Sequence, residues 1–266
     1  MDLVAVDAGR SFTKVKVGNR VFEFPSKVSK ALEGHRDQMP GDLEVRYQGK
    51  DYFVGRLAER EGYAWTNMLE TKVHEQTLIE ILTACFLAEV VGKVAIMTSI
   101  PINMYSKEME RSGLKKLLVG DHEILVNGVY RKLQVEKVGI GLECACSYFN
   151  HKRPGKVRII DPGARTTNFA TYQDGIYIGK ESGTISYGWD SVRGSDPDLM
   201  ANLIISEIGK SWSTSDQLEI IGGRAQDLEL PMQKQGFVHT HAVTDAKYAN
   251  VTGLYEIGRN LISVQG

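Results

Sequence analysis

The chain has 266 residues, enough for one large domain or two ordinary ones with an ample core. Its 32 Lys and Arg residues balance 33 Asp and Glu residues to a net charge of −1, which gives no electrostatic basis for direct binding to nucleic acid. No apolar run approaches the roughly 20 residues of a membrane span, and we expect a cytoplasmic protein without a signal peptide. Cys85, Cys144 and Cys146 are interpreted as small core residues in a reducing compartment.

The chain begins with a predicted hairpin around a tight turn. Residues 3–6 form a short apolar run typical of a buried strand, and residues 14–17 alternate Lys with Val as a second strand would. Asp7 and Gly9 lie in the turn between them. Glycine lets the backbone approach a ligand closely, successive N–H groups can bind an anion, and a carboxylate can hold a hydrated cation. An ordinary tight hairpin is the alternative interpretation of this turn.

Apolar spacing and turn residues predict the next elements of the first half. In chain order they are a strand at 20–24, a hairpin at 43–55, a helix from His74 to Val91 ended by Gly92, a strand at 94–101, a short helix capped by Ser106 and running through Leu118, a hairpin at 123–138 around Asn127-Gly128, and a loop leading into a helix within 139–149 that contains Glu143, Cys144 and Cys146. Residues 26–42 have no clear period, and the pattern of residues 61–71 is ambiguous.

The second half opens with a copy of the first hairpin in residues 157–172. In both copies a glycine follows the aspartate by two residues and a threonine follows it by six: Asp7, Gly9 and Thr13, then Asp161, Gly163 and Thr167. This long-range repetition predicts two related halves. We expect the two turns to face each other across a cleft and to hold the phosphates of a nucleotide together with its metal ion.

The rest of the second half again mixes strands and helices. The predicted elements are a strand after Asp174-Gly175, a helix starting at Asp196-Pro197 and ended by Gly209, a strand at 218–221 that runs into a glycine pair, a strand at 237–244, and a helix from 248 to 264. The stretch 151–156 is the best candidate for a domain boundary. The fold class that follows is α/β.

Five motifs, in this order, resemble those of the actin and Hsp70 ATPase superfamily. They are residues 7–14 as a first phosphate loop, 139–149 as a first interdomain connection, 159–169 as a second phosphate loop, 220–225 as an adenosine loop, and 247–258 as a second connection. The last motif, KYANVTGLYEIG, has the form found in ParM-type bacterial actins, the plasmid segregation branch. The resemblance implies an actin-like (ribonuclease H-like) fold of two lobes that duplicate one sheet-and-helix architecture.

The spacing of the motifs indicates a compact branch of that family. Only 61 positions separate Asp161 from Gly222, which is too short for the subdomain IIB that normally lies between them. The chain therefore resembles the AlfA proteins, which lack it. The resemblance assigns residues 1–153 to lobe I, with residues 248–266 returning to it as a C-terminal helix, and residues 154–247 to lobe II.

The resemblance also implies roles for individual residues, with ATP (or GTP) and Mg²⁺ as the ligands. Asp7 and Asp161 match the two acids that hold Mg²⁺, through its waters because that ion dehydrates reluctantly. Lys14 matches a lysine on the terminal phosphates, and Glu143 the catalytic residue that orients the attacking water. The remaining nucleotide-binding positions are Gly9, Arg10, Ser11 and Phe12 at the β-phosphate, Gly163, Ala164, Arg165 and Thr166 at the γ-phosphate, and Gly222, Gly223 and Arg224 under the nucleoside.

The second loop departs from the family pattern. It carries Pro162, Arg165 and Asn168 where relatives usually have more glycine and a closing acid. Asn168 removes a charge near the metal, so slow hydrolysis and altered sensing of the nucleotide are both open. Two interpretations without a functional role also stay open: Glu143 as a surface acid where two domains meet, and Lys14 as a solvated lysine on a strand.

The function that the resemblance implies is an ATPase whose filament segregates plasmid DNA. Nucleotide binding drives the chain to polymerise with itself into a double-helical filament, hydrolysis loosens the polymer, and a DNA-binding adaptor protein couples it to a centromere-like plasmid site. Direct contact with DNA or a membrane is not expected. The alternatives are a small-molecule kinase of the same superfamily, for which the sequence has no distinct acceptor motif, and a non-hydrolysing nucleotide-binding scaffold.

Overall fold

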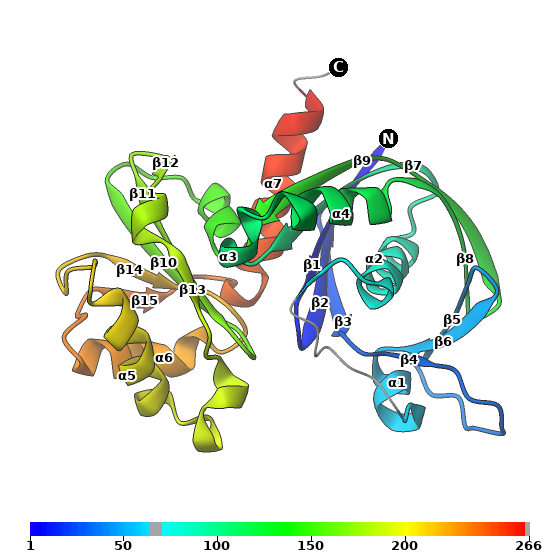
Figure 1. Cartoon of the computed structure of the whole chain (residues 1–266), viewed down its shortest axis with the longest axis horizontal. Coiled ribbons are helices and arrows are strands. Elements are labelled where there is room, and N and C mark those ends of the chain that lie inside the picture. The colour runs from blue at the N-terminus through cyan, green and yellow to red at the C-terminus, as the bar shows by residue number, and fades with distance from the viewer. Residues whose placement is uncertain (64–70, 264–266) are drawn as a thin grey trace. The chain divides into compact units, whose positions relative to one another are not determined.

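The computed structural model describes residues 1–63 and 71–263, so most of the stretch 61–71 lies outside it. The chain divides into two compact units, each of which combines distant parts of the sequence. Unit 1 comprises residues 1–98, 107–140 and 261–266, and unit 2 comprises residues 99–106 and 141–260 (Figure 1). The division into lobes at residues 153 and 154 stays a prediction, because units defined by contacts need not coincide with lobes.

Most of unit 1 is built on one curved sheet. Its strand order within the described residues is β3 (Arg20–Pro25), β2 (Phe12–Val17), β1 (Asp2–Ala8), β7 (Gly92–Ile100), β9 (Val129–Leu142), β8 (Gly120–Val126), β5 (Leu43–Tyr47), β6 (Lys50–Val54) and β4 (Val28–Lys30). β1 pairs with β2 antiparallel and with β7 parallel. Val4, Ala5 and Val6 are fully buried, which is the reason for the apolar run at the start of the chain.

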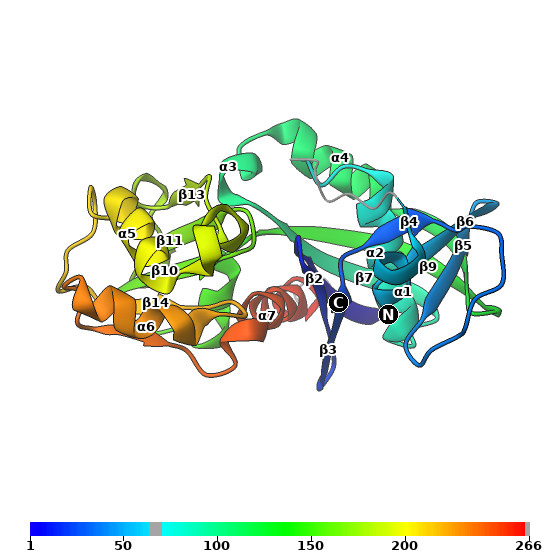
Figure 2. The ribbon, with the colours of Figure 1, turned by 90° about the horizontal axis from the view of Figure 1, so that it is seen from below.

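Three helices accompany this sheet: α1 (Arg56–Glu61), α2 (Glu75–Leu87) and α4 (Glu108–Leu118). α2 packs against β1, β2, β4 and β8 inside the curve of the sheet (Figures 1 and 2). Its predicted end at Gly92 was wrong: the helix ends at Leu87, and Glu89 takes the left-handed conformation there with a φ of 63°. Ser106 is not a helix start either, since it ends the short helix α3 (Ile102–Tyr105) and Lys107 precedes α4.

Unit 2 has a smaller sheet with helices packed on it. The strand order is β12 (Ile176–Tyr177), β11 (Thr167–Gln173), β10 (Lys156–Pro162), β14 (Leu218–Ile220) and β15 (Thr240–Ala242), with β13 (Gly183–Ile185) paired to β11. The helices are α3, α5 (Pro197–Ile208), α6 (Ala225–Lys234) and most of α7 (Ala249–Ser263). The 3-10 turns are η1 (Ala145–Asn150), η2 (Gly179–Glu181), η3 (Trp189–Ser191), η4 (Arg193–Ser195) and η5 (Ala246–Tyr248).

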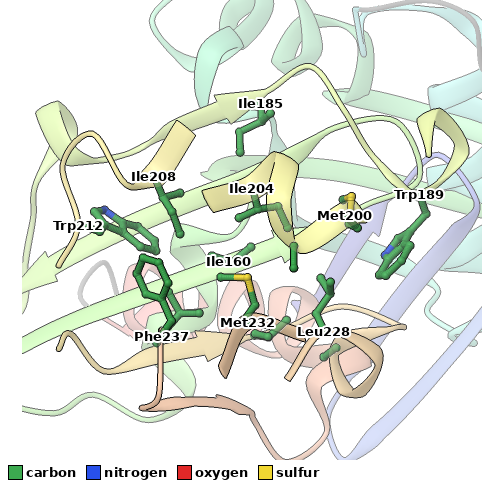
Figure 3. Packing of buried hydrophobic residues seen from close by; sticks show 14 of the residues in the cluster. Ile160, Ile185, Trp189, Met200, Ile204, Ile208, Trp212, Leu228, Met232 and Phe237 are labelled. Atoms are coloured by element: carbon green, nitrogen blue, oxygen red, sulfur yellow. The ribbon is translucent and has the colours of Figure 1, made fainter. Parts of the chain in front are cut away.

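The start and end of α5 confirm the prediction from Asp196-Pro197 and Gly209. The Asp196 side chain accepts a hydrogen bond from the Asp198 N–H at 2.9 Å, and Pro197 occupies the first helical position. The buried face of α5 then packs with α6 onto the sheet (Figure 3). This core contains Ile160, Ile185, Trp189, Met200, Ile204, Ile208, Trp212, Leu228, Met232 and Phe237.

The predicted helix within 139–149 differs from the observed structure. β9 continues to Leu142, and the 3-10 turn η1 begins only at Ala145, so Glu143 and Cys144 precede it. Cys144 has a φ of 66°, a conformation that side chains other than glycine rarely adopt. This turn breaks the helical pattern that the sequence suggested.

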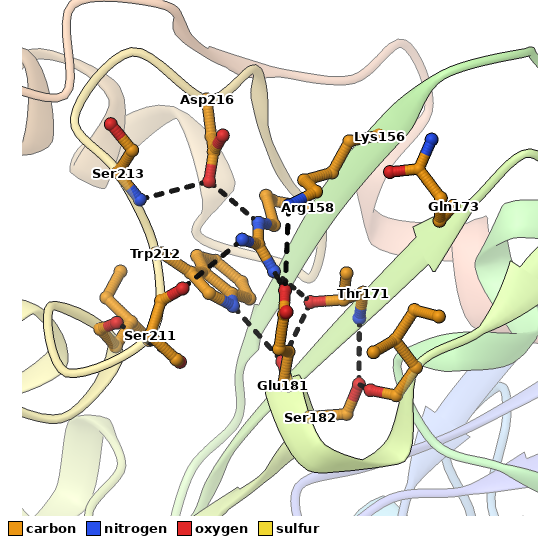
Figure 4. Close-up of polar contacts among 12 residues, drawn as sticks. Lys156, Arg158, Thr171, Gln173, Glu181, Ser182, Ser211, Trp212, Ser213 and Asp216 are labelled. Carbon is orange, nitrogen blue, oxygen red and sulfur yellow. Dashed lines mark hydrogen bonds and ion pairs between the residues drawn. The ribbon is translucent and has the colours of Figure 1, made fainter.

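Arg158 on β10 is the largest fully buried side chain of unit 2, and its guanidinium is held on several sides (Figure 4). It donates to Asp216 Oδ2 at 2.9 Å and to Thr171 Oγ1 at 2.6 Å, and it forms an ion pair with Glu181. It also lies 4.9 Å from the ring centre of Trp212. The guanidinium holds the pKa of Glu181 below its usual range.

Replacing Arg158 should test how much this buried cation contributes. We expect Arg158→Met to lower the free energy of unfolding by about 2–4 kcal/mol at neutral pH, because two carboxylates lose their partner. Since the folded state lowers the pKa of Glu181, this contribution is present above the unfolded pKa and fades as the pH falls through the folded one. Urea unfolding at several pH values measures it. Lys210→Met, in an exposed pair with Glu207, should cost less than about 1 kcal/mol.

Candidate functional site

The first turn, residues 7–14, belongs to unit 1 and closes through backbone contacts. The Gly9 N–H donates to the Asp7 carbonyl at 2.9 Å. A Cβ on Gly9 would lie 2.8 Å from the Phe12 carbonyl oxygen, closer than side chains tolerate. The turn therefore needs glycine for close backbone approach.

The second turn, residues 161–168 of unit 2, repeats the close approach of a glycine to the carbonyl three residues later, although its glycine N–H has a different acceptor. The Gly163 N–H donates to the Thr166 carbonyl at 2.9 Å, and a Cβ there would lie 3.0 Å from the same oxygen. The strand registers also agree, since Asp7 pairs with Lys14 across the first hairpin and Asp161 pairs with Asn168 across the second. The repeat seen in the sequence is thus a repeat of structure, and Asn168 occupies the place that Lys14 holds in the first turn.

Segment 188–190 supports the backbone of the second turn. The N–H groups of Trp189 and Asp190 donate to the carbonyls of Gly163 and Ala164 at 3.0 and 2.8 Å. A Cβ on Gly188 would lie 2.5 Å from Ala164 backbone atoms, so the two segments touch directly. These contacts fix the shape of the second turn.

Beside the first turn, Lys72 is a buried residue that the sequence analysis missed. Its ammonium donates to the carbonyl of Ala8, next to Asp7, and its exposed fraction is only 6%. Asp7 itself is 5% exposed, whereas Lys14 is half-buried. Lys72 follows a stretch whose pattern is ambiguous, so no pattern in the sequence could have indicated it.

Glu80 on α2 is a buried acid that faces the charges around this turn. Its exposed fraction is 3%, and burial raises the pKa of its carboxyl from an ordinary 4.5 to about 8, against the opposing effect of Lys72, Arg10 and Lys27. The carboxyl is therefore mostly protonated at neutral pH.

We expect this acid to make the stability of the protein depend on pH. Between pH 4.5 and about 8 the unfolded chain has lost the Glu80 proton while the folded chain keeps it. Stability should therefore fall as the pH rises through this window, by about 1.4 kcal/mol per unit from this group alone. Glu80→Gln should remove that component, so the variant gains on the unsubstituted protein from pH 5 to 8 in urea unfolding. Parallel stability curves for the two proteins would contradict the assignment.

In unit 2, Glu143 is joined to the second turn by an amide. Asn168 Nδ2 donates to Glu143 Oε2 at 3.1 Å, and Asn168 Oδ1 accepts from the Thr184 hydroxyl at 2.7 Å. The Glu143 N–H donates to the Ile100 carbonyl at 2.9 Å. The residue that departs from the family pattern, Asn168, thus orients the carboxylate of Glu143.

Asp161 is joined to the segment after Glu143 by a second amide. Asn250 Nδ2 donates to Asp161 Oδ2 at 2.6 Å, and Asn250 Oδ1 accepts from the Cys144 N–H at 3.0 Å. Burial raises the pKa of the Cys144 thiol well above its usual value, so it stays protonated. The predicted core role of this cysteine fits its complete burial.

The glycine pair after β14 lies against Asp161. Gly222 has a φ of 98°, and a Cβ there would lie 2.9 Å from Asp161 Oδ1. Gly223 is exposed and has open space where a Cβ would be. Arg224 is held by unit 2 itself, since its guanidinium lies 3.6 Å from the ring centre of Trp189 and donates to Asp227 at 2.6 Å.

The different surroundings of the two glycines predict different effects of alanine. Gly222→Ala should lower the free energy of unfolding by about 1–3 kcal/mol, because it combines a strained φ with a clash against a carboxylate. Gly223→Ala is the matched control and should change stability by less than about 0.5 kcal/mol. Thermal and urea unfolding compare them, and equal losses would contradict the role given to Gly222.

The carboxylate oxygens of the predicted site suit a magnesium ion. Within residues 1–63 and 71–263 no group of three or more His, Cys, Asp or Glu side chains could hold a metal ion by itself. Mg²⁺ does not need such a group, because it typically uses one or two carboxylates together with phosphate and water. Asp161 fits this role, since only glycine at 222 leaves room beside its Oδ1.

The structure brings the predicted residues together in two sets. Asp7, Gly9, Arg10, Ser11, Phe12 and Lys14 share the first turn of unit 1, and Glu143, Asp161, Gly163, Ala164, Arg165, Thr166, Gly222, Gly223 and Arg224 belong to unit 2. Residues 161–222 all belong to unit 2, without a further compact unit among them. In the described part of the chain, no helix is long and apolar enough to cross a membrane.

Comparison with known proteins gives a family and a fold. The model of a family described as the N-terminal domain of actin-like proteins matches residues 5–145. A structure of the apo psk41 ParM protein is similar at a TM-score of 0.80 and 18% identity, over 99% of this chain and 98% of that one. None of the curated protein sequences compared with the chain matches it.

Two AlfA filament structures are similarly close. The filament bound to AMPPNP has a TM-score of 0.79 at 18% identity, over 98% of each chain. The filament of AlfA from B. subtilis plasmid pLS32 has a TM-score of 0.78 at 20% identity, over 96% of this chain and 98% of that one. These similarities confirm the predicted actin-like α/β fold.

Proposed function

The chain belongs to the actin-like proteins, and we propose that it is an ATP- or GTP-driven filament protein that segregates plasmid DNA. The observation that carries the proposal is the duplicated turn. In two separate units, a Cβ on Gly9 or Gly163 would lie 2.8 or 3.0 Å from the carbonyl oxygen three residues later. Support also comes from the AlfA structures, which are filaments, one with the nucleotide analogue AMPPNP.

In this proposal both turns bind the phosphates of one nucleotide. Backbone N–H groups of residues 10–12 and 164–166 bind the β- and γ-phosphates, Gly9 and Gly163 let the backbone come close to them, and Lys14 adds a positive charge. Asp7 and Asp161 are the residues that would hold Mg²⁺, which would offset phosphate charge when bound. Gly222 and Gly223 let the nucleoside approach, whereas Arg224 mainly supports the loop through Trp189.

Glu143 orients the attacking water. Phosphoryl transfer requires mainly positioning and charge compensation, and a carboxylate that accepts a hydrogen bond from water suits the first task. Asn168 Nδ2 donates a hydrogen bond to Glu143 Oε2 at 3.1 Å and so fixes the direction of the carboxylate. Because Asn168 is neutral, the side chain that contacts Glu143 here adds no negative charge, as an acid at position 168 would.

The partners follow from the family and the charge. The protein assembles with itself, and a DNA-binding adaptor links the filament to a centromere-like plasmid site in the cytoplasm. A net charge of −1 gives the chain little attraction of its own for DNA, which favours an adaptor.

Light scattering and pelleting on addition of nucleotide test this function. We expect scattering to rise and protein to pellet with Mg-ATP or Mg-GTP, and both signals to disappear with excess EDTA. A protein that binds nucleotide yet stays monomeric at high concentration contradicts the filament. Nucleotide consumption that depends on an added sugar or other small alcohol would instead identify a kinase.

Replacing Glu143 separates hydrolysis from assembly. Glu143→Gln keeps an oxygen for the Asn168 amide but accepts more weakly from water, so we expect phosphate release to fall about 100-fold. Filaments should still form and should last longer. Glu207→Gln on α5 changes a half-buried acid of the same unit, which pairs with Lys210, and should leave the rate unaltered. Unchanged phosphate release in Glu143→Gln would show that Glu143 is only a surface acid.

A further inference from the structure

Asn250, the second residue of α7, connects two segments that are far apart in the sequence. Its side-chain Nδ2 lies 2.6 Å from Asp161 Oδ2, 89 residues away, and its Oδ1 lies 3.0 Å from the Cys144 nitrogen, 106 residues away. Asn250 is 6% exposed. A buried amide with both ends occupied has one fixed orientation.

The orientation of this amide follows from chemistry. The Cys144 N–H can only donate, so the amide atom that faces it must be the oxygen. The nitrogen therefore faces Asp161 and donates to its carboxylate. A charge-assisted hydrogen bond at 2.6 Å fixes the plane of the Asp161 carboxylate.

Asn250 and Asn168 together close a ring of contacts around the two acids. The ring runs from Asp161 through Asn250 to Cys144, back one residue to Glu143, through Asn168, and across the β10–β11 pair to Asp161. All members belong to unit 2. The distance between the two carboxylates is thus set by two neutral amides.

The backbone that carries Asn250 is itself firmly held against η1. A Cβ on Gly253 would lie 1.9 Å from the Cys146 carbonyl oxygen, so α7 and η1 touch at their backbones. The Cys146 thiol contacts the Asn250 carbonyl at 3.4 Å, and Asn150 Nδ2 donates to the Ala249 carbonyl at 2.9 Å. The Asn250 amide is therefore pre-organised before any ligand binds.

We propose that Asn250 is a positioning residue, which holds the Asp161 carboxylate in place for the magnesium-nucleotide and fixes its placement relative to Glu143. This inference rests on the proposed function. It deepens that function because the sequence analysis interpreted the motif around Asn250 only as a connection and gave Asn250 no role in binding. Partners that orient metal-binding carboxylates commonly contribute 10- to 100-fold to metal affinity or activity. Asn250 acts through Asp161 and does not itself touch the ligand.

Asn150 provides a matched control. Like Asn250 it is an asparagine that joins η1 to α7, but its amide contacts only the Ala249 carbonyl among the two segments. Asn150→Ala should lower the free energy of unfolding by about the contribution of one hydrogen bond and leave Asp161 and Glu143 in place. Asn250→Ala removes the donor from Asp161, and Asn250→Ser serves as a second variant because its shorter side chain cannot span both partners.

The experiment measures nucleotide affinity by calorimetry, first in EDTA and then over a series of Mg²⁺ concentrations, below the unfolding temperature of every variant. We expect all variants to bind nucleotide equally in EDTA. The Mg²⁺ concentration that gives half of the affinity gain should rise about 10- to 100-fold in Asn250→Ala and Asn250→Ser, and stay unchanged in Asn150→Ala. Phosphate release at saturating Mg²⁺ should also fall in the Asn250 variants alone.

The possible outcomes separate the inference from the function beneath it. If both Asn250 variants keep the Mg²⁺ midpoint of the unsubstituted protein, or if Asn150→Ala shifts it equally, the positioning role is overturned while nucleotide binding stands. If the unsubstituted protein binds no nucleotide with or without Mg²⁺, the proposed function fails and this inference with it. A variant that fails to fold is recognised by circular dichroism, and the surviving Asn250 variant then decides.

Discussion

The hydrogen bond from the Asn250 amide to Asp161 is the contact on which the arrangement of unit 2 depends. It joins the N-terminus of α7 to the end of β10, and the same amide joins both to the turn after Glu143. Because Asn250 is buried, neither bond can be exchanged cheaply for a bond to water. Three of the five sequence motifs therefore meet at one carboxylate, since Gly222 also lies against Asp161, and the motif at 139–149 is joined to it through Asn250.

The two turns share one backbone feature but carry different side chains around it. In each turn a glycine approaches a carbonyl three residues later, so the shape is set by the absence of a Cβ. The residues across the hairpins then diverge, with Lys14 opposite Asp7 and Asn168 opposite Asp161. The first turn gains a cation, whereas the second gains a neutral amide that orients Glu143.

Each unit buries an ionisable side chain in its interior. Glu80 lies behind the first turn, where burial raises its pKa against three nearby cations. Arg158 lies on β10, three residues before Asp161, and its partners are two carboxylates and an aromatic ring. Glu80 avoids the cost of a buried charge by keeping its proton, and Arg158 offsets that cost through its ion pairs, so both constrain the packing of the elements around them.

The sequence by itself determined the features that depend on a few neighbouring residues. Both glycine turns, the hairpin at Asn127-Gly128 and the start of α5 at Asp196-Pro197 follow from local backbone preferences, and motif order gave the fold. The tertiary structure alone decided where α2 ends, that Glu143 precedes η1, and which partners Lys72 and Asn250 meet 64 and 89 residues away. Such contacts depend on how distant segments pack, which no local pattern of residues records.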